Sequence, residues 1–154
     1  MRIYQKPIYI NGEREKVSRE KLNVLTKKSH RVLYKIRTVW PFDFFPDTVS
    51  INENSVDLTN KLFFYSQQVY SIPISDIKQV VLSTSLFFAE MNLYVVEWTE
   101  KNPPPVRYLR TNEALEAKCI IDGLIACQRE GIDVSVFDTR LLKRKFEEIG
   151  HMRS

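Results

Sequence analysis

Glycine, cysteine and histidine are scarce in this chain, which has 4 Gly, 2 Cys and 2 His among 154 residues. With so few glycines, no Gly-rich loop of the Walker or Rossmann type is present to cradle phosphate groups. The absence of Cys-x-x-Cys and His-Glu-x-x-His spacings argues against a metal centre. We therefore predict no catalytic, cofactor-binding or metal-ligating residues and no small-molecule substrate. We expect the protein not to be an enzyme.

Long apolar runs are missing as well. No stretch of about 18 consecutive apolar residues occurs, so no transmembrane helix is predicted. The first residues, MRIYQKPIYINGEREK, lack the continuous apolar region of a secretory signal. Cys119 and Cys127 are separated by about 12 Å of axial rise in a predicted helix, which is too far for a disulfide. We expect free thiols and a cytoplasmic location, with peripheral docking at the inner membrane surface if the ligand is a lipid.

Basic residues are concentrated near the N-terminus. Residues 1–40 contain eleven Lys or Arg against three Glu, whereas residues 41–154 contain twelve against sixteen Asp or Glu. We interpret residues 1–30 as a basic N-terminal arm, within which PIYING is predicted as a short strand and SREKLNVLTKKS as a short helix. The arm is either simply solvated or serves an anionic partner such as nucleic acid, phospholipid headgroups or an acidic protein face.

Seven short strands are predicted between residues 31 and 110. They are RVLYKIRTVW, TVSI, SVDLT, KLFFYSQQVYSIPI, DIKQVVLS, LFFAEMNLYVVEW and VRYLR. Each is rich in β-branched or aromatic residues, and short antiparallel strands joined by turns indicate a barrel or sandwich. Asn52-Glu53-Asn54 forms a tight turn, because Asn tolerates the left-handed conformation. The turn places four apolar residues on the buried face of a hairpin, namely Val49, Ile51, Val56 and Leu58.

Two helices are predicted after the strands. The first, TNEALEAKCIIDGLIACQREG, has Thr111 or Asn112 as its N-cap and ends at Gly131. Its inward face repeats every three and four residues and comprises Ala117, Ile120, Ile121, Leu124, Ile125 and Gln128. The second, DTRLLKRKFEEIG, is capped by Asp138 and closed by Gly150. Its inward-facing residues are Leu142, Phe146 and Ile149.

Three segments together resemble the pleckstrin-homology-like (PH-like) superfamily, especially its small bacterial PH and GRAM-type members. They are FPDTVSINENSVDL, VYSIPISDIKQVVLS and YLRTNEALEAKCIIDGLIA. The resemblance covers residues 31–131 and implies a mainly β fold, a seven-stranded antiparallel barrel or sandwich capped by an α-helix. Residues 132–154 add a second short C-terminal helix that packs on or extends the domain.

The segment VWPFDFFPDT has the highest density of aromatic residues and contains two prolines that fix its backbone. We favour a role for its aromatics in closing one end of the barrel. Alternatively, some of them contact a protein or a lipid surface, but Asp43 and Asp47 oppose binding to anionic lipid. The candidate contact residues for a partner or a lipid are Lys35, Arg37, Trp40, Phe42, Phe44 and Phe45.

The function predicted from these features is that of a non-catalytic PH-like binding or scaffolding module. PH-like proteins recognise lipid headgroups or peptides, and a peptide can add a strand to an open sheet edge. We expect a protein partner or self-association first, because open edges tend to pair. The alternatives are an anionic phospholipid surface reached through the basic arm and, less favoured, nucleic acid bound by residues 1–40.

Overall fold

The structure is a computed structural model of the chain and describes residues 9–29, 31–39, 45–63, 66–96 and 102–151. It divides into two compact units, Met1–Arg31 and Val32–Ser154.

The first unit contains one helix, α1 (Tyr9–Ser29). Its side chains are exposed from Gly12 to Val24, and an ion pair of 2.7 Å joins Arg19 to Glu15 one turn earlier. The strand predicted at PIYING is therefore wrong from Tyr9 onward, and the short predicted helix is the second half of a longer one. A helix satisfies its own backbone hydrogen bonds, whereas a lone strand without a neighbouring strand cannot.

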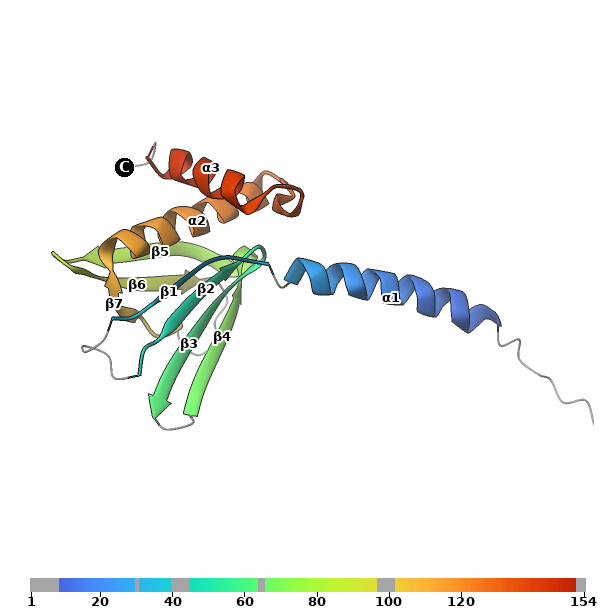
Figure 1. Cartoon of the computed structure of the whole chain (residues 1–154), viewed down its shortest axis with the longest axis horizontal. Helices are drawn as coiled ribbons and strands as arrows, with labels where there is room; N and C mark the ends of the chain where they lie inside the picture. The colour runs from blue at the N-terminus through green and yellow to red at the C-terminus, as the bar shows by residue number, and fades with distance from the viewer. Residues whose placement is uncertain (1–8, 30, 40–44, 64–65, 97–101, 152–154) are drawn as a thin grey trace, which may run out of the picture. The chain divides into compact units, whose positions relative to one another are not determined.

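The second unit contains two antiparallel sheets (Figure 1). The first has the order β1-β2-β3-β4 and the second the order β5-β6-β7. The strands are β1 (Val32–Arg37), β2 (Thr48–Asn52), β3 (Ser55–Phe63), β4 (Ser66–Pro73), β5 (Ile77–Thr84), β6 (Phe88–Val95) and β7 (Val106–Arg110). The predicted arrangement, seven antiparallel strands in a sandwich followed by helices, is confirmed.

The hairpin of β2 and β3 has the predicted register. Val49 pairs with Leu58 and Ile51 pairs with Val56, and the exposed fraction of all four side chains is at most 1%. Alternation with a period of two residues was sufficient to identify this face, because a shift of one residue would turn every apolar side chain outward.

The boundary between β3 and β4 differs from the prediction. The sequence pattern predicts one strand over KLFFYSQQVYSIPI. In the structure this stretch contains the end of β3, which finishes at Phe63, and the whole of β4, which begins at Ser66. The two strands pair from Ser55↔Pro73 to Phe63↔Ser66. The stretch has no Gly, Pro or Asn where the chain reverses, so the usual turn signals are absent.

Helix α2 (Thr111–Arg129) follows β7 directly. Its N-cap is Arg110, with no capping side chain, so the predicted cap at Thr111 or Asn112 is wrong. The Thr111 hydroxyl instead donates to the Ser85 carbonyl oxygen at 3.4 Å. The predicted inward face is buried except for Gln128, which is exposed because it lies in the last turn, beyond the buried stripe. Gly131, with φ of +69°, lies just past the helix end, as predicted.

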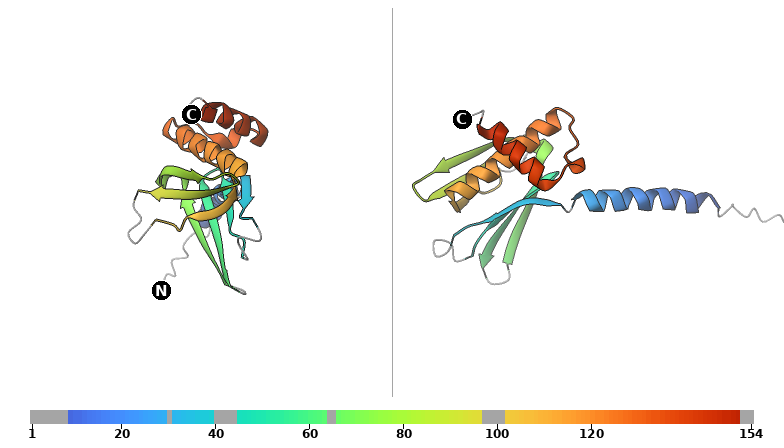
Figure 2. Two further views of the ribbon diagram at one scale, coloured as in Figure 1. Left: turned by 90° about the vertical axis from the view of Figure 1, so that its left-hand side faces the viewer. Right: turned by 45° about the horizontal axis from the view of Figure 1, so that its top comes forward.

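Helix α3 (Thr139–His151) packs on α2 (Figure 2). The Asp138 carboxylate accepts a hydrogen bond from the Arg140 backbone at 3.1 Å, which confirms the predicted cap. Leu142 and Phe146 are buried as predicted, and Ile149 is partly buried against the core. Gly150 does not close the helix, which continues to His151. A Cβ atom at Gly150 would overlap the Cys119 side chain of α2, so the glycine leaves room for that side chain.

One hydrophobic core joins both sheets, α2 and α3. A backbone hydrogen bond connects the sheets where the Val39 N–H, just after β1, donates to the Tyr108 carbonyl of β7 at 3.0 Å, and the Ile74 N–H, just after β4, donates to the Asn54 carbonyl in the β2–β3 turn at 2.9 Å. A short 3-10 turn, η1 (Ile74–Asp76), leads from β4 into β5, and a second, η2 (Val134–Val136), lies between α2 and α3. The strand orders leave β1, β4, β5 and β7 as sheet edges.

Candidate functional site

Three of the six predicted contact residues are among the described residues. Lys35 and Arg37 are exposed on one face of this strand, and Phe45 is half-buried. Trp40, Phe42 and Phe44 lie outside the described residues. The role of the aromatic segment therefore stays a prediction.

A shallow hollow of about 440 Å³ adjoins Lys35 and Arg37. Arg110 and Glu113 at the start of α2 complete its rim, and they form an ion pair of 3.3 Å. The hollow thus brings two of the predicted residues together with a third cation, Arg110. All three cations belong to residues that are largely exposed, so water screens their charge.

A larger groove lies between β5 and α2, with a volume of about 640 Å³. It is lined by Lys78, Gln79, Val80, Val81, Leu82, Lys118, Asp122, Ile125, Ala126, Arg129 and Glu130. Both elements are predicted from the sequence but the groove is not, because nothing in the spacing along either element shows that they lie side by side. The signal that was available is the row Lys118, Asp122 and Ala126, which follows the border of the buried helix stripe at four-residue spacing.

The groove has an apolar floor and charged walls. Val80 and Ile125 are buried to 3% and 9% exposure and contribute to the floor. Lys118 and Asp122 form an ion pair along α2, one turn apart. Lys78, Lys118 and Arg129 contribute three positive charges to the lining, against two carboxylates, Asp122 and Glu130. The groove is therefore slightly cationic.

Strand β5 offers backbone groups along this groove. Its pairing within the described residues is with β6 alone, and its other side is an edge of the sheet. The register shifts between Ile77 and Gln79, which limits the regular edge to the part of the strand that follows. An edge of this kind can accept hydrogen bonds from, and donate them to, an added strand.

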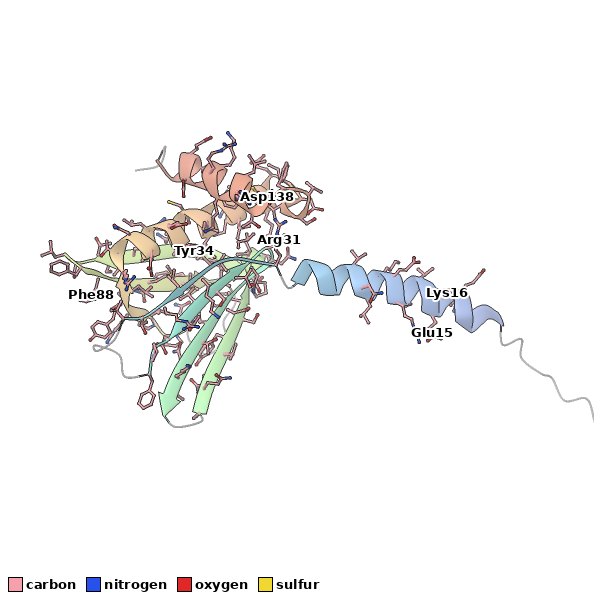
Figure 3. The ribbon with its side chains drawn as sticks, in the orientation of Figure 1. Glu15, Lys16, Arg31, Tyr34, Phe88 and Asp138 are labelled. Atoms are coloured by element: carbon pink, nitrogen blue, oxygen red, sulfur yellow. The ribbon has the colours of Figure 1, made fainter. Side chains whose placement is uncertain are left out.

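The hairpin between β5 and β6 carries apolar side chains into solvent. Leu86 is 86% exposed and Phe87 is 70% exposed, so neither side chain is part of the core. The adjacent Phe88, labelled in Figure 3, begins β6, and its ring meets the Tyr108 ring of β7 edge-on with centroids 6.3 Å apart.

This hairpin follows β5 and lies beside the start of α2. The hydrogen bond from Thr111 to Ser85 holds the hairpin beside the first turn of α2. Leu115, one turn further along, is 46% exposed and lies on the same helix face as Lys118 and Asp122, because these positions are three and seven residues away. Exposed apolar side chains thus lie beside the first turns of α2, outside the set of residues that line the groove.

Tyr34, Glu116 and Lys143 link β1 to both C-terminal helices on another face of α2. The Tyr34 hydroxyl donates to Glu116 at 2.7 Å, and the Lys143 amine donates to the other oxygen of the same carboxylate at 3.4 Å. The amine also lies 4.2 Å from the centre of the Tyr34 ring. Burial, followed by the Glu116 hydrogen bond, raises the pKa of Tyr34 above its ordinary value of 10.0. These contacts hold α3 against β1 and α2. None of the three residues lines the groove between β5 and α2.

The two thiols are free and half-buried. Burial raises the pKa of both Cys119 and Cys127, which keeps them in the protonated form at neutral pH. Across the described residues, no cluster of three or more His, Cys, Asp or Glu side chains is arranged to hold a metal ion. None of the helices in the described part of the chain is long and apolar enough to cross a membrane.

No protein-family model matches the chain, and no curated protein matches it in sequence. One solved structure that it resembles is a DUF1696-family protein with a pleckstrin-homology domain from Shewanella loihica, at 14% sequence identity and a TM-score of 0.45. The alignment covers 62% of this chain and 81% of that protein. At this level of similarity the match assigns no ligand.

Proposed function

We propose that the protein is a non-catalytic binding module that receives an extended segment of a partner protein in the groove between β5 and α2. The observation that carries the proposal is the position of an edge strand beside a helix, with a groove of about 640 Å³ between them. A peptide laid along β5 extends the three-stranded sheet by one strand and packs its side chains against α2.

The chemistry of the groove defines the kind of segment it fits. Alternate side chains of an added strand point to opposite faces, so every second residue faces the floor at Val80 and Ile125. Lys78 and Arg129 favour a peptide with a carboxylate near the charged end. A peptide that extends past the end of β5 reaches the exposed Leu86 and Phe87, which favour an apolar residue there, whose burial contributes about 1.5–3 kcal/mol. We therefore propose a short acidic segment with a terminal apolar anchor.

Selection from a library of displayed random peptides tests this proposal. We expect enriched peptides to contain an acidic residue and an apolar anchor. Bound to the isotopically labelled protein, they should shift the backbone amide resonances of Lys78–Leu82 and of α2 from Lys118 to Glu130. The substitution Ala126→Trp fills the groove and should weaken binding at least about tenfold, a loss of roughly 1.4 kcal/mol.

The substitution Leu141→Trp is the matched control, because Leu141 is an exposed apolar residue on α3 outside the groove. It should leave peptide binding unchanged. Peptides that bind with equal affinity to the wild type and to Ala126→Trp, and that shift resonances around Lys35 and Arg37 instead, would place the binding surface at the end of β1 and refute the proposal.

A further inference from the structure

Strand β4 is an edge strand without any charged residue. Its eight residues are SQQVYSIP, and the side chains of Ser66–Val69 are exposed. Edge strands in natural proteins usually carry lysines, inward-pointing charges or central prolines that prevent pairing with other chains. The only proline of β4, Pro73, is its last residue, next to the corner that leads into β5, so Ser66–Ser71 has no such protection.

The other three edge strands carry positive charges. β1 contains Lys35 and Arg37, β7 contains Arg107 and Arg110, and β5 contains Lys78. In an antiparallel pair around a two-fold axis, residues equally far from the axis on either side lie opposite one another, so an axis at Ile36 of β1 places Lys35 opposite Arg37. Like charges opposite one another destabilise strand pairing. Of these four edges, β4 has no charged residue, so no register of its self-pairing brings like charges together.

The exposed surface along β4 also favours pairing. Within the described residues β4 pairs with β3 alone, so its outer side has backbone groups directed away from the sheet. Val69, in the middle of the strand, is 57% exposed although it is β-branched and apolar. Leu62, near the end of the neighbouring strand, is 53% exposed.

We infer that two copies of this chain associate by antiparallel pairing of β4 with β4 across a two-fold axis. A second copy is the partner that fits, because the strand offers no charge by which to select a different one. An axis at Val69 places Val69 opposite its copy and Gln68 opposite Tyr70, which buries the apolar side chain against itself. The two four-stranded sheets then form one continuous sheet, and the two β5–α2 grooves remain separate from the interface.

Sedimentation velocity of the full chain over a concentration series tests this inference. We expect a monomer–dimer equilibrium for the wild type. Val69→Lys places two ammonium groups opposite each other and should raise the dimer dissociation constant at least about tenfold. Thr59→Lys is the control, since Thr59 pairs with Val69 from the next strand inward and adds the same charge away from the edge. It should leave the equilibrium unchanged.

A wild type that stays monomeric at all concentrations overturns the inference, and so does a dimer that survives Val69→Lys. Dimerisation lost on removing residues 1–29, but retained in Val69→Lys, assigns the contact to α1 instead. Circular dichroism of Val69→Lys verifies that the variant is folded. Its peptide binding should equal that of the wild type, so failure of the dimer does not bear on the proposed groove.

Cross-linking tests the register directly. Under mild oxidation, Val69→Cys should give a covalent dimer in high yield, because paired residues have Cα atoms about 4.5–5.5 Å apart. Thr59→Cys should not, since it is one strand further from the axis on each side. The wild type, with its half-buried Cys119 and Cys127, measures the background. Equal cross-linking of all three proteins would contradict the pairing.

Discussion

Gly123 provides the space on α2 in which the Phe146 ring of α3 lies. A Cβ atom at Gly123 would overlap that ring, and Phe146 itself is 1% exposed. Since the ring is enclosed by the core, it has little room to move away. The contact therefore depends on a residue without a side chain, although glycine is otherwise unfavourable in the middle of a helix.

The substitution Gly123→Ala is expected to destabilise the unit Val32–Ser154 by about 1–3 kcal/mol, because overpacking outweighs the better helix propensity of alanine. Chemical denaturation measures the change. Gly12→Ala is the control: nothing lies within 4 Å of a Cβ atom at that position, so only the propensity of α1 changes. If Gly123→Ala were as stable as the wild type, Phe146 would not be held as tightly as its burial indicates.

Tyr34 gives a second prediction at the scale of one residue. Its pKa is raised in the folded protein, so above pH 10.0 the unfolded chain loses a proton that the folded chain keeps. The stabilisation is complete below this pH and is lost as the pH rises towards the folded pKa. We expect the free energy of unfolding to fall above pH 10.0 in the wild type and to fall less steeply in Tyr34→Phe.

Denaturant unfolding below and above pH 10.0 measures this difference. Tyr34→Phe also removes the hydrogen bond to Glu116, which should cost about 1–3 kcal/mol at neutral pH. In an absorbance titration of the phenolates, the substitution should remove a late-titrating group. If both proteins lost stability equally with rising pH, the burial of Tyr34 would not be the cause.

At the scale of secondary-structure elements, the sequence was informative where one face of an element is buried. The alternation in β2 and β3 identified Val49 and Ile51 as core residues, and the spacing in α2 identified Ile120 and Leu124. The sequence was not informative where contacts with neighbouring elements determine the local structure. The turn between β3 and β4 has no turn residues, and the first turn of α2 uses Thr111 to hold the β5–β6 hairpin instead of its own backbone.

The groove could not be predicted for the same reason. Its apolar floor looks like ordinary core in the sequence, since Val80 and Ile125 belong to regular buried patterns. Its charged lining, such as Lys118 and Asp122, looks like an ordinary solvated helix face. Only the tertiary arrangement, in which α2 lies beside one edge of the second sheet, turns these residues into a site.

Helix α1 has no buried side chain over the part of it, Gly12–Val24, whose side chains are described. Its residues from Gly12 to Val24 are exposed, and the described core begins at Leu33. Deleting residues 1–29 is therefore expected to leave the melting temperature of the remaining chain unchanged within about 2 °C. A shift of that size corresponds to a change of less than about 1 kcal/mol in the free energy of unfolding. Differential scanning calorimetry measures this. A fall in melting temperature as large as that caused by a core substitution would show that α1 stabilises the remainder of the chain.

At the scale of the whole molecule, charge is divided between the two units. Residues 1–31 contain nine Lys or Arg against three Glu, whereas residues 32–154 contain fourteen against sixteen Asp or Glu. The chain as a whole has a net charge of +4, but the part that contains both sheets is close to neutral. Attraction to a polyanion at long range should therefore come from the N-terminal segment, and it is screened by salt.

Heparin chromatography and co-sedimentation with anionic vesicles test this division. We expect the full chain to bind at low salt and to be released steeply as salt rises, because binding releases counterions. The chain lacking residues 1–29 should not bind. Full-length protein with Lys35→Gln and Arg37→Gln is the control and should still bind, since it keeps the N-terminal cations. Binding that survived the deletion but not this double substitution would instead move the anionic contact to the hollow formed by Lys35, Arg37 and Arg110.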